Sequence, residues 1–168
     1  MREIVARDLM LQNFTKVRAD HTLGEAMQAL VDLQGESRVP NALVVLDANS
    51  RYEGILTARL LLKSLLTLWM PGRATHQDEA MLEKELLDVV RERSRMAVHG
   101  ALIRGLPTAA PSDRLLALVE IACDKRLEFV PVVDDGHVVG LVPVTQIFLA
   151  AASLALTPEH EGIRFDQE

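Results

Sequence analysis

The stretch FVPVVDDGHVVGLVPVTQIFLAA, residues 129–151, contains the pattern that decides the fold. Its first two segments, 129–135 and 137–142, are rich in valine and are typical of short strands. The Asp-Gly pair between them predicts a tight hairpin turn. The apolar run 143–156 follows the second strand and predicts a helix that is buried on most sides. The expected order is therefore strand, turn, strand and helix.

The first half of the chain contains a second copy of this pattern. The segments ALVVLD (42–47) and YEGILT (52–57) predict another pair of strands, and the leucine-rich run 57–70 predicts the helix after them. In this alignment Gly54 corresponds to Gly140. Such internal similarity indicates that the chain contains a duplicated structural unit.

An amphipathic helix is expected before each pair of strands. Residues 21–33 place Leu23, Ala26, Met27, Leu30 and Leu33 at helical spacing, and residues 113–125 do the same with Leu115, Leu118, Val119 and Ala122. Thr22 and Glu25 fit a capping box, in which each side chain accepts a hydrogen bond from a free backbone amide at the helix start. The first of the two helices therefore has its own start signal.

These elements predict an α/β (α+β) fold of two repeated β-α-β-β-α units with a helix between them. We expect the units at residues 1–70 and 99–156, a linker at 71–98 and a tail at 157–168. Asp78 is the expected N-cap of the linker helix. The apolar stripe of that helix consists of Leu82, Leu86, Val89, Arg93 and Met96. This stripe predicts that the helix packs on the core or on a second subunit.

Composition argues against several classes of function. The chain has 168 residues and a formal net charge of −6, whereas nucleic-acid binding needs a clustered basic face. The apolar segments 60–70 and 147–156 are shorter than the roughly 18–20 residues that span a bilayer, so no membrane span is expected. The charged N-terminal residues do not form a secretory signal, and a cytoplasmic protein is expected.

Catalytic and metal-binding chemistry is not expected. The five histidines are scattered, and none has a metal-ligand spacing such as HExxH. Asp134 and Asp135 are a possible carboxylate pair, but their position before Gly136 favours a turn. The single cysteine, Cys123, lies in an apolar helical pattern and is expected to be a buried structural thiol. The sequence therefore suggests a protein that is not an enzyme.

Four motifs occur in order along the chain: ARDLM (6–10), SRVP (37–40), GILTARLL (54–61) and VPVVDDGHVVGLV (130–142). Together they resemble a tandem pair of CBS domains, which is called a Bateman module. The resemblance implies two repeats packed with pseudo-two-fold symmetry and two clefts between them. In many family members these clefts bind the adenosine group of AMP, ADP, ATP or a related ligand. The resemblance also implies a regulatory role toward an effector protein and assembly into a dimer.

For the first cleft, the resemblance implies a site at the start of the last helix and at the strand edges. Thr57 lies in the Gly-x-x-Thr/Ser-x-x-Asp stretch of the family, but Leu60 replaces the aspartate that binds the ribose hydroxyls. Arg38 occupies a position where the family often has a phosphate ligand. The expected cofactor-binding residues are Lys16, Val17, Arg38, Thr57 and Arg59. Helix capping alone is the alternative explanation of Thr57.

For the second cleft, the corresponding residues are less suited to a phosphorylated ligand. Pro143 replaces the hydroxyl residue and removes a backbone amide, and the neutral Gln146 replaces the aspartate. Glu128 occupies a position where a cation would help, and an acid there repels phosphate. The expected binding residues are Thr108, Pro131 and Gln146. Pro143 also fits the first turn of a helix, so a purely structural role is the alternative.

The sequence favours two functions over a third, a small metabolic enzyme for which no acid or nucleophile can be named. One is a regulatory sensor that binds AMP, ADP, ATP or S-adenosylmethionine and signals to a partner protein. The other is a dimerisation or interaction module whose clefts bind no nucleotide. Helices 57–70 and 143–156 carry more apolar surface than one small sheet covers, which predicts a homodimer formed through them.

Overall fold

The computed structural model describes residues 3–33, 41–66, 78–102, 105–125 and 127–157. The helices are α1 (Ala6–Leu9), α2 (Leu23–Asp32), α3 (Ala58–Leu66), α4 (Glu79–Arg93), α5 (Leu115–Lys125) and α6 (Val144–Leu156), with a short 3₁₀ helix η1 (Val98–Ala101) before α5. The strands are β1 (Thr15–Arg18), β2 (Ala42–Leu46), β3 (Tyr52–Thr57), β4 (Phe129–Asp134) and β5 (His137–Pro143). The expected duplicated order of helix, two strands and helix is confirmed.

The two repeats form two small sheets. In the first repeat the strand order is β1-β2-β3, with β1 parallel to β2 and β2 antiparallel to β3. In the second repeat β4 and β5 form an antiparallel pair, and the early strand is reduced to a parallel bridge between Ala109 and Val132. Pro107 and Pro111 flank this bridge, and a proline has no backbone amide with which to extend a strand ladder.

The Asp-Gly hairpin turn is confirmed. Asp135 and Gly136 have φ values of 50° and 76°, as a type I′ turn requires at both central positions. The side chain of Arg51 lies against Gly136, and the backbone amide of Tyr52 donates to the Gly136 carbonyl at 3.0 Å. The hairpin of the second repeat is therefore fixed against the first repeat.

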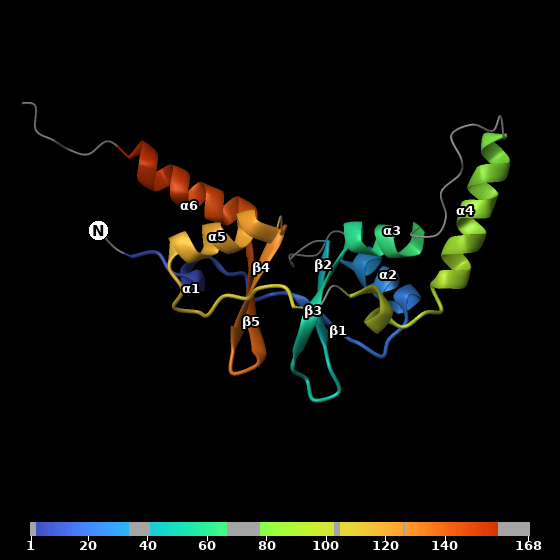
Figure 1. Cartoon of the computed structure of the whole chain (residues 1–168), viewed down its shortest axis with the longest axis horizontal. Helices are drawn as coiled ribbons and strands as arrows, with labels where there is room; N and C mark the ends of the chain where they lie inside the picture. Colours follow the sequence, from blue (N-terminus) through green and yellow to red (C-terminus); the bar gives the residue numbers. More distant parts are fainter. Residues whose placement is uncertain (1–2, 34–40, 67–77, 103–104, 126, 158–168) are drawn as a thin grey trace, which may run out of the picture.

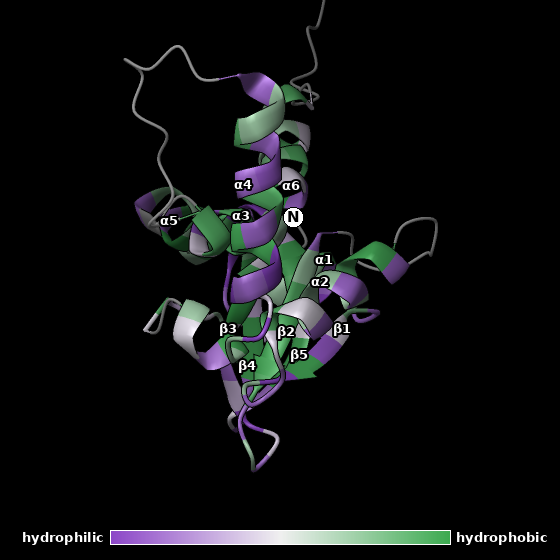
Figure 2. Cartoon of the chain, turned by 90° about the vertical axis from the view of Figure 1, so that its right-hand side faces the viewer, coloured by the Kyte–Doolittle hydropathy of each residue, from purple (hydrophilic) through white to green (hydrophobic). Residues whose placement is uncertain are grey.

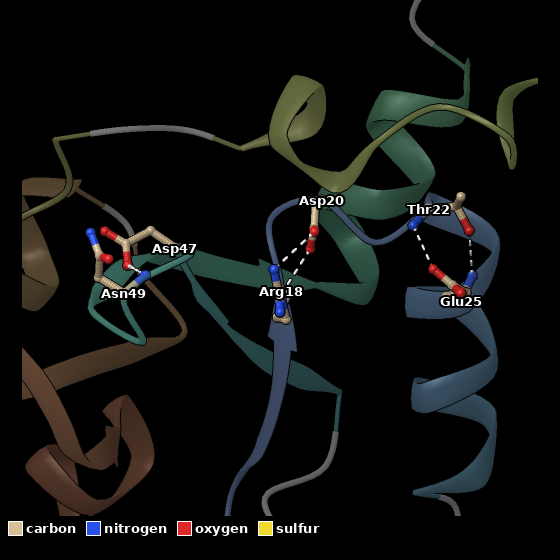
Figure 3. Close-up of polar contacts among 6 residues, drawn as sticks. All are labelled: Arg18, Asp20, Thr22, Glu25, Asp47 and Asn49. Atoms are coloured by element: carbon tan, nitrogen blue, oxygen red, sulfur yellow. Dashed lines mark hydrogen bonds and ion pairs between the residues drawn. The ribbon is translucent and has the colours of Figure 1, made fainter.

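The capping box at the start of α2 is also confirmed. The Glu25 amide donates to Thr22 Oγ1 at 3.1 Å, and the Thr22 amide donates to Glu25 Oε2 at 2.8 Å (Figure 3). Leu23, Ala26 and Leu30 face inward and join the core of the first repeat. The capping box and the apolar spacing of α2 thus agree with its tertiary packing.

The segment that precedes each repeat packs on the other repeat. Helix α1 packs on the segment that leads into α5, where the amide of Ala6 donates to the carbonyl of Asp113 at 2.8 Å and the amide of Arg7 donates to the carbonyl of Pro111 at 3.0 Å. Ala6 is fully buried in the core of the second repeat. Reciprocally, Val98 of η1 is buried in the core of the first repeat, and its amide donates to the His21 carbonyl at 2.7 Å. This exchange ties the two repeats together.

Gly140 is required by the close approach of α1 to β5. A Cβ atom at this position would lie only 2.7 Å from Met10 Sδ and 2.8 Å from Met10 Cβ. Leu11, the next residue, exchanges two backbone hydrogen bonds with Leu141 at 2.8 and 3.0 Å. The glycine therefore allows the N-terminal segment to lie directly on the second sheet.

A third apolar cluster lies between the two sheets. It contains Ala42, Val44 and Ile55 from the first repeat and Val138 and Leu141 from the second. All five residues are buried. The repeats therefore share one interface core, to which both sheets contribute.

Helix α4 begins after Asp78, whose Oδ1 accepts a hydrogen bond from the Ala80 amide at 3.2 Å. The expected N-cap is thus confirmed. None of the α4 side chains is fully buried, and hydrophilic residues cover most of its turns (Figure 2). The helix contacts α3, and Arg93 Nη1 donates to the Ser64 carbonyl at 2.9 Å. Helix α4 is therefore a peripheral element.

The expectation that Cys123 is buried is wrong, because this side chain is exposed. The buried face of α5 contains Leu118 and Ala122, which are four residues apart. Cys123 follows Ala122 directly and is therefore rotated by about 100° away from that face.

Of the helix expected at 57–70, residues 67–70 lie outside the described part of the chain.

Candidate functional site

A cavity of about 140 Å³ lies between the two repeats. Its first wall is the corner where β3 ends and α3 begins, and its second wall is the start of β4 with the residues just before it. The described lining residues are Tyr52, Ile55, Thr57, Arg59, Leu60, Leu106, Leu127, Glu128, Phe129 and Pro131. A volume of this size holds roughly one aromatic ring system.

The corner in the first repeat is built around Thr57. Thr57 is the last residue of β3, and its Oγ1 accepts a hydrogen bond from the Leu60 amide at 3.2 Å. This bond is a helix N-cap, which stabilises the start of α3 by about 1 kcal/mol. Thr57 is 9% exposed, and its hydroxyl proton can still be donated to a group in the cavity. The structural role of Thr57 therefore does not prevent it from binding a ligand.

The second wall brings an acidic residue to the same corner. Arg59 Nε lies 3.4 Å from Glu128 Oε1, so an ion pair joins the first turn of α3 to the segment before β4. Both side chains are partly exposed, at 83% and 40%, and such a pair contributes about 0–1 kcal/mol to stability. The Glu128 carbonyl also accepts a hydrogen bond from the Val144 amide at 3.0 Å, which fixes the backbone of this wall.

Tyr52 lines the cavity and carries a buried hydroxyl group. Among the described residues, its oxygen has no hydrogen-bond partner. Burial raises the pKa of the Tyr52 phenol from 10.0 to about 12, because the charged phenolate is poorly solvated there. An unpaired buried hydroxyl costs about 1–3 kcal/mol, so this position is a local weakness in the cavity wall.

We expect Tyr52→Phe to stabilise the protein by about 1 kcal/mol at neutral pH, because it removes the unpaired hydroxyl. The wild type should also lose stability as the pH rises from 10 to about 12, since only the unfolded chain ionises its tyrosine easily in that range. The shift of about two pKa units corresponds to about 2–3 kcal/mol. Urea unfolding of both proteins across this pH range measures the difference.

Tyr52 is the only tyrosine in the chain, so its ionisation can be followed directly by ultraviolet absorbance. The native protein should form phenolate with a midpoint near pH 12. A midpoint near pH 10 while the protein is still folded would contradict the burial of this hydroxyl.

The cavity brings together three of the residues expected from the sequence. Thr57 and Arg59 come from the first repeat and Pro131 from the second. The sequence assigns these residues to two separate clefts, whereas all three line one cavity in the structure. Glu128, which the sequence places with the second cleft, also faces Thr57 and Arg59 here.

The other expected site residues are not among the described lining residues of this cavity. Val17 is buried in the core of the first repeat, and Lys16 is exposed with its Nζ 5.6 Å from the centre of the Phe14 ring. Thr108 is exposed and precedes the Ala109 bridge. Gln146 lies in the first turn of α6. Arg38 lies outside the described residues.

The start of α6 differs in detail from the expectation. Pro143 is the N-cap of α6, one residue before the first helical turn, and it also ends β5 opposite Phe129. No side-chain capping bond is present at this position, because proline has no polar side chain. The corner at Pro143 therefore lacks the hydroxyl that Thr57 supplies in the first repeat.

Sequence reasoning missed Tyr52, Ile55, Leu106 and Leu127 as cavity residues. These side chains are mostly apolar, and their spacing in the sequence gives no sign that they meet. The expectation that the clefts lie between the repeats was the available signal, because it requires each cleft to take residues from both halves of the chain.

A second hollow lies at the C-terminal end of β1, and its charged side chains have partners within the protein. Arg18 donates two hydrogen bonds of 3.0 Å to the carboxylate of Asp20 (Figure 3). Asp47 Oδ1 accepts a hydrogen bond of 2.7 Å from the backbone amide of Asn49. His99 Nδ1 lies 3.4 Å from Glu53 Oε1. The described part of the chain contains no cluster of three or more side chains suited to a metal ion.

None of the helices in the described ranges is long and apolar enough to cross a bilayer. The longest of them, α4, has 15 residues and a charged surface.

Comparison with solved structures defines the class of fold. The chain is similar to the CBS domain of a CBS domain-containing membrane protein from Sphaerobacter thermophilus, with a TM-score of 0.67, 22% identity and 88% of each chain covered. It is also similar to the CBS domain pair of MJ0100 in complex with 5′-methylthioadenosine and S-adenosyl-L-methionine (TM-score 0.64, 17% identity, 91% and 99% covered). A third similar structure is CBSX2 in complex with AMP, with a TM-score of 0.61 and 19% identity; the match covers 90% of this chain and 98% of CBSX2.

The sequence supports the same family. Residues 6–67 match the family model of the CBS domain. The chain therefore contains a CBS domain in its first half, and its overall fold is that of a tandem CBS pair. No curated protein matches the chain in sequence.

Proposed function

We propose that the protein is a non-catalytic, cytoplasmic regulatory module that binds an adenosine-containing ligand between its repeats. The observation that carries this proposal is the cavity itself, whose walls are Thr57 and Leu60 on one side and Glu128 and Pro131 on the other. The ligand is expected to come from the class of AMP, ADP, ATP and S-adenosylmethionine. Similar folds in complex with AMP and with S-adenosyl-L-methionine support this choice.

The cavity geometry also suggests how a bound ligand is sensed. A ligand that contacts Thr57 and Pro131 touches both repeats at once. Such a ligand favours the arrangement of the repeats in which it makes both contacts, and it therefore shifts the population of the module toward that arrangement. An effector protein that recognises one arrangement would respond to the ligand.

Calorimetric titration with adenosine, AMP, ATP and S-adenosylmethionine tests this function. We expect at least one of these compounds to bind the wild type with a stoichiometry of one per chain. Thr57→Val should weaken that binding by about three- to tenfold, because the hydroxyl that donates into the cavity is lost. Thr57→Ser keeps the hydroxyl and is the matched control. If no adenosine compound binds at millimolar concentration, the proposal is wrong.

The second candidate function, an interaction module, is favoured by the exposed surface of α6. This helix lies along the outside of the second repeat (Figure 1), and only Ile147 is fully buried. Its exposed large apolar side chains are Phe148, Leu149, Leu154 and Leu156. In α3, Leu62 is also 59% exposed. We propose that these helices form a homodimer interface, which is compatible with ligand binding in the cavity.

We expect the combined substitution Phe148→Glu and Leu149→Glu to convert a dimer into a monomer, because it places charge in an apolar interface. Light scattering at micromolar protein concentration measures the mass. Leu87→Glu on α4 is the control, since Leu87 is also an exposed leucine but lies outside both helices. A monomeric wild type would contradict the dimer proposal, whereas a dimer that survives the combined substitution would exclude this interface.

A further inference from the structure

The described lining of the cavity contains one acid and one base, which offset each other. Of the described lining residues, Arg59 and Glu128 are the charged ones, and they form an ion pair. A phosphate group that approached Arg59 would have to displace the Glu128 carboxylate or remain close to it. Both alternatives are unfavourable, because like charges repel and a displaced carboxylate loses its partner.

The helix start at this corner offers little compensation. A free helix N-terminus binds phosphate through its unpaired backbone amides. In α3 the amide of Leu60 already donates to Thr57 Oγ1. One of the amides that would hold a phosphate is therefore already used by the protein.

The rest of the cavity suits an uncharged, flat group. Ile55, Leu60, Leu106, Leu127 and Phe129 supply apolar contacts. The described part of the cavity, with a volume of about 140 Å³, is close in size to one flat ring system. The bound complex of MJ0100 with 5′-methylthioadenosine shows that this fold is compatible with an adenosine compound that has no phosphate.

We infer that the cavity selects adenosine compounds without a phosphate group, and that Glu128 is the residue that sets this preference. The inference rests on the proposed function, because it names the ligand class of the same site. Glu128 acts by its negative charge and by holding Arg59 in the ion pair. Removing that charge while keeping the shape should open the site to phosphate.

Parallel titrations with adenosine and AMP test the inference. The wild type should bind adenosine at least about tenfold more tightly than AMP, which corresponds to about 1.4 kcal/mol. Glu128→Gln should tighten AMP binding by about tenfold and change adenosine binding by no more than about twofold. Adding Arg59→Gln to this variant should remove the gain, because the released guanidinium is the expected phosphate partner. Glu120→Gln, on the exposed side of α5, should change neither affinity.

The outcomes separate this inference from the proposed function. If the wild type binds AMP as tightly as adenosine, or if Glu128→Gln leaves the ratio of the two affinities unchanged, the inference is wrong and the proposed function stands. If neither compound binds the wild type or the Glu128 variant, the inference is wrong, and the proposed function is wrong as well if ATP and S-adenosylmethionine also fail to bind. The preference should also decrease at high salt, since it depends on a partly exposed charge.

Discussion

Leu141→Ala is expected to lower the free energy of unfolding by about 3 kcal/mol. Leu141 is completely buried and belongs to the cluster between the two sheets, together with Val44 and Ile55 of the first repeat. Truncating a buried leucine costs about 2–5 kcal/mol, because it removes apolar contacts and leaves a cavity. The backbone of Leu141 also holds Leu11 through two hydrogen bonds, so there is little freedom for the site to collapse.

Urea unfolding of the variant measures this loss and also tests whether the repeats form one unit. Because the cluster is shared, both repeats should unfold in a single transition that shifts as a whole. Leu116→Ala is the matched control, since Leu116 is 70% exposed on α5 and should change the stability by less than about 0.5 kcal/mol. Two separate transitions, of which only one shifts, would contradict the shared core.

Leu60→Trp is expected to weaken adenosine binding by about ten- to a hundredfold. Leu60 lines the cavity from the first turn of α3, and a larger side chain there occupies the space that the ligand needs. Steric overlap in a packed site costs about 1–3 kcal/mol, which gives this range of affinities. Since Leu60 is only partly buried, the fold should tolerate the change better than the site does.

The same titration on Leu62→Trp provides the control for this prediction. Leu62 lies on the same helix but is 59% exposed and is not among the described lining residues. Its replacement should leave adenosine binding within about twofold of the wild type. Equal binding by the Leu60 and Leu62 variants would show that the ligand occupies some other place.

The elements of the fold were largely predictable because their signals are local. The capping box of Thr22 and Glu25, the Asp-Gly turn and the apolar spacing of α2 each involve residues within a few positions of one another. Local signals of this kind survive tertiary packing when they agree with it. The family model over residues 6–67 and the similar folds agree with the resemblance seen in the motifs.

The pairing between the repeats was less predictable, because it depends on contacts between distant parts of the chain. The exchange of α1 and η1 joins Ala6 to Asp113 and Val98 to His21, and no local pattern indicates these contacts. For the same reason the sequence associated Glu128 with the cleft of Gln146, whereas the structure places it beside Arg59. The sequence indicates what each side chain can bind, but it does not indicate which side chains lie together in the folded protein.

The central claim is that an adenosine-containing ligand binds between Thr57 and Pro131. A crystal structure of the protein with adenosine tests it most directly. We predict density for the base within the cavity, in contact with Leu60 and Phe129 and with both repeats at once. A saturated crystal in which this cavity is empty, or in which adenosine lies elsewhere on the molecule, would contradict the claim.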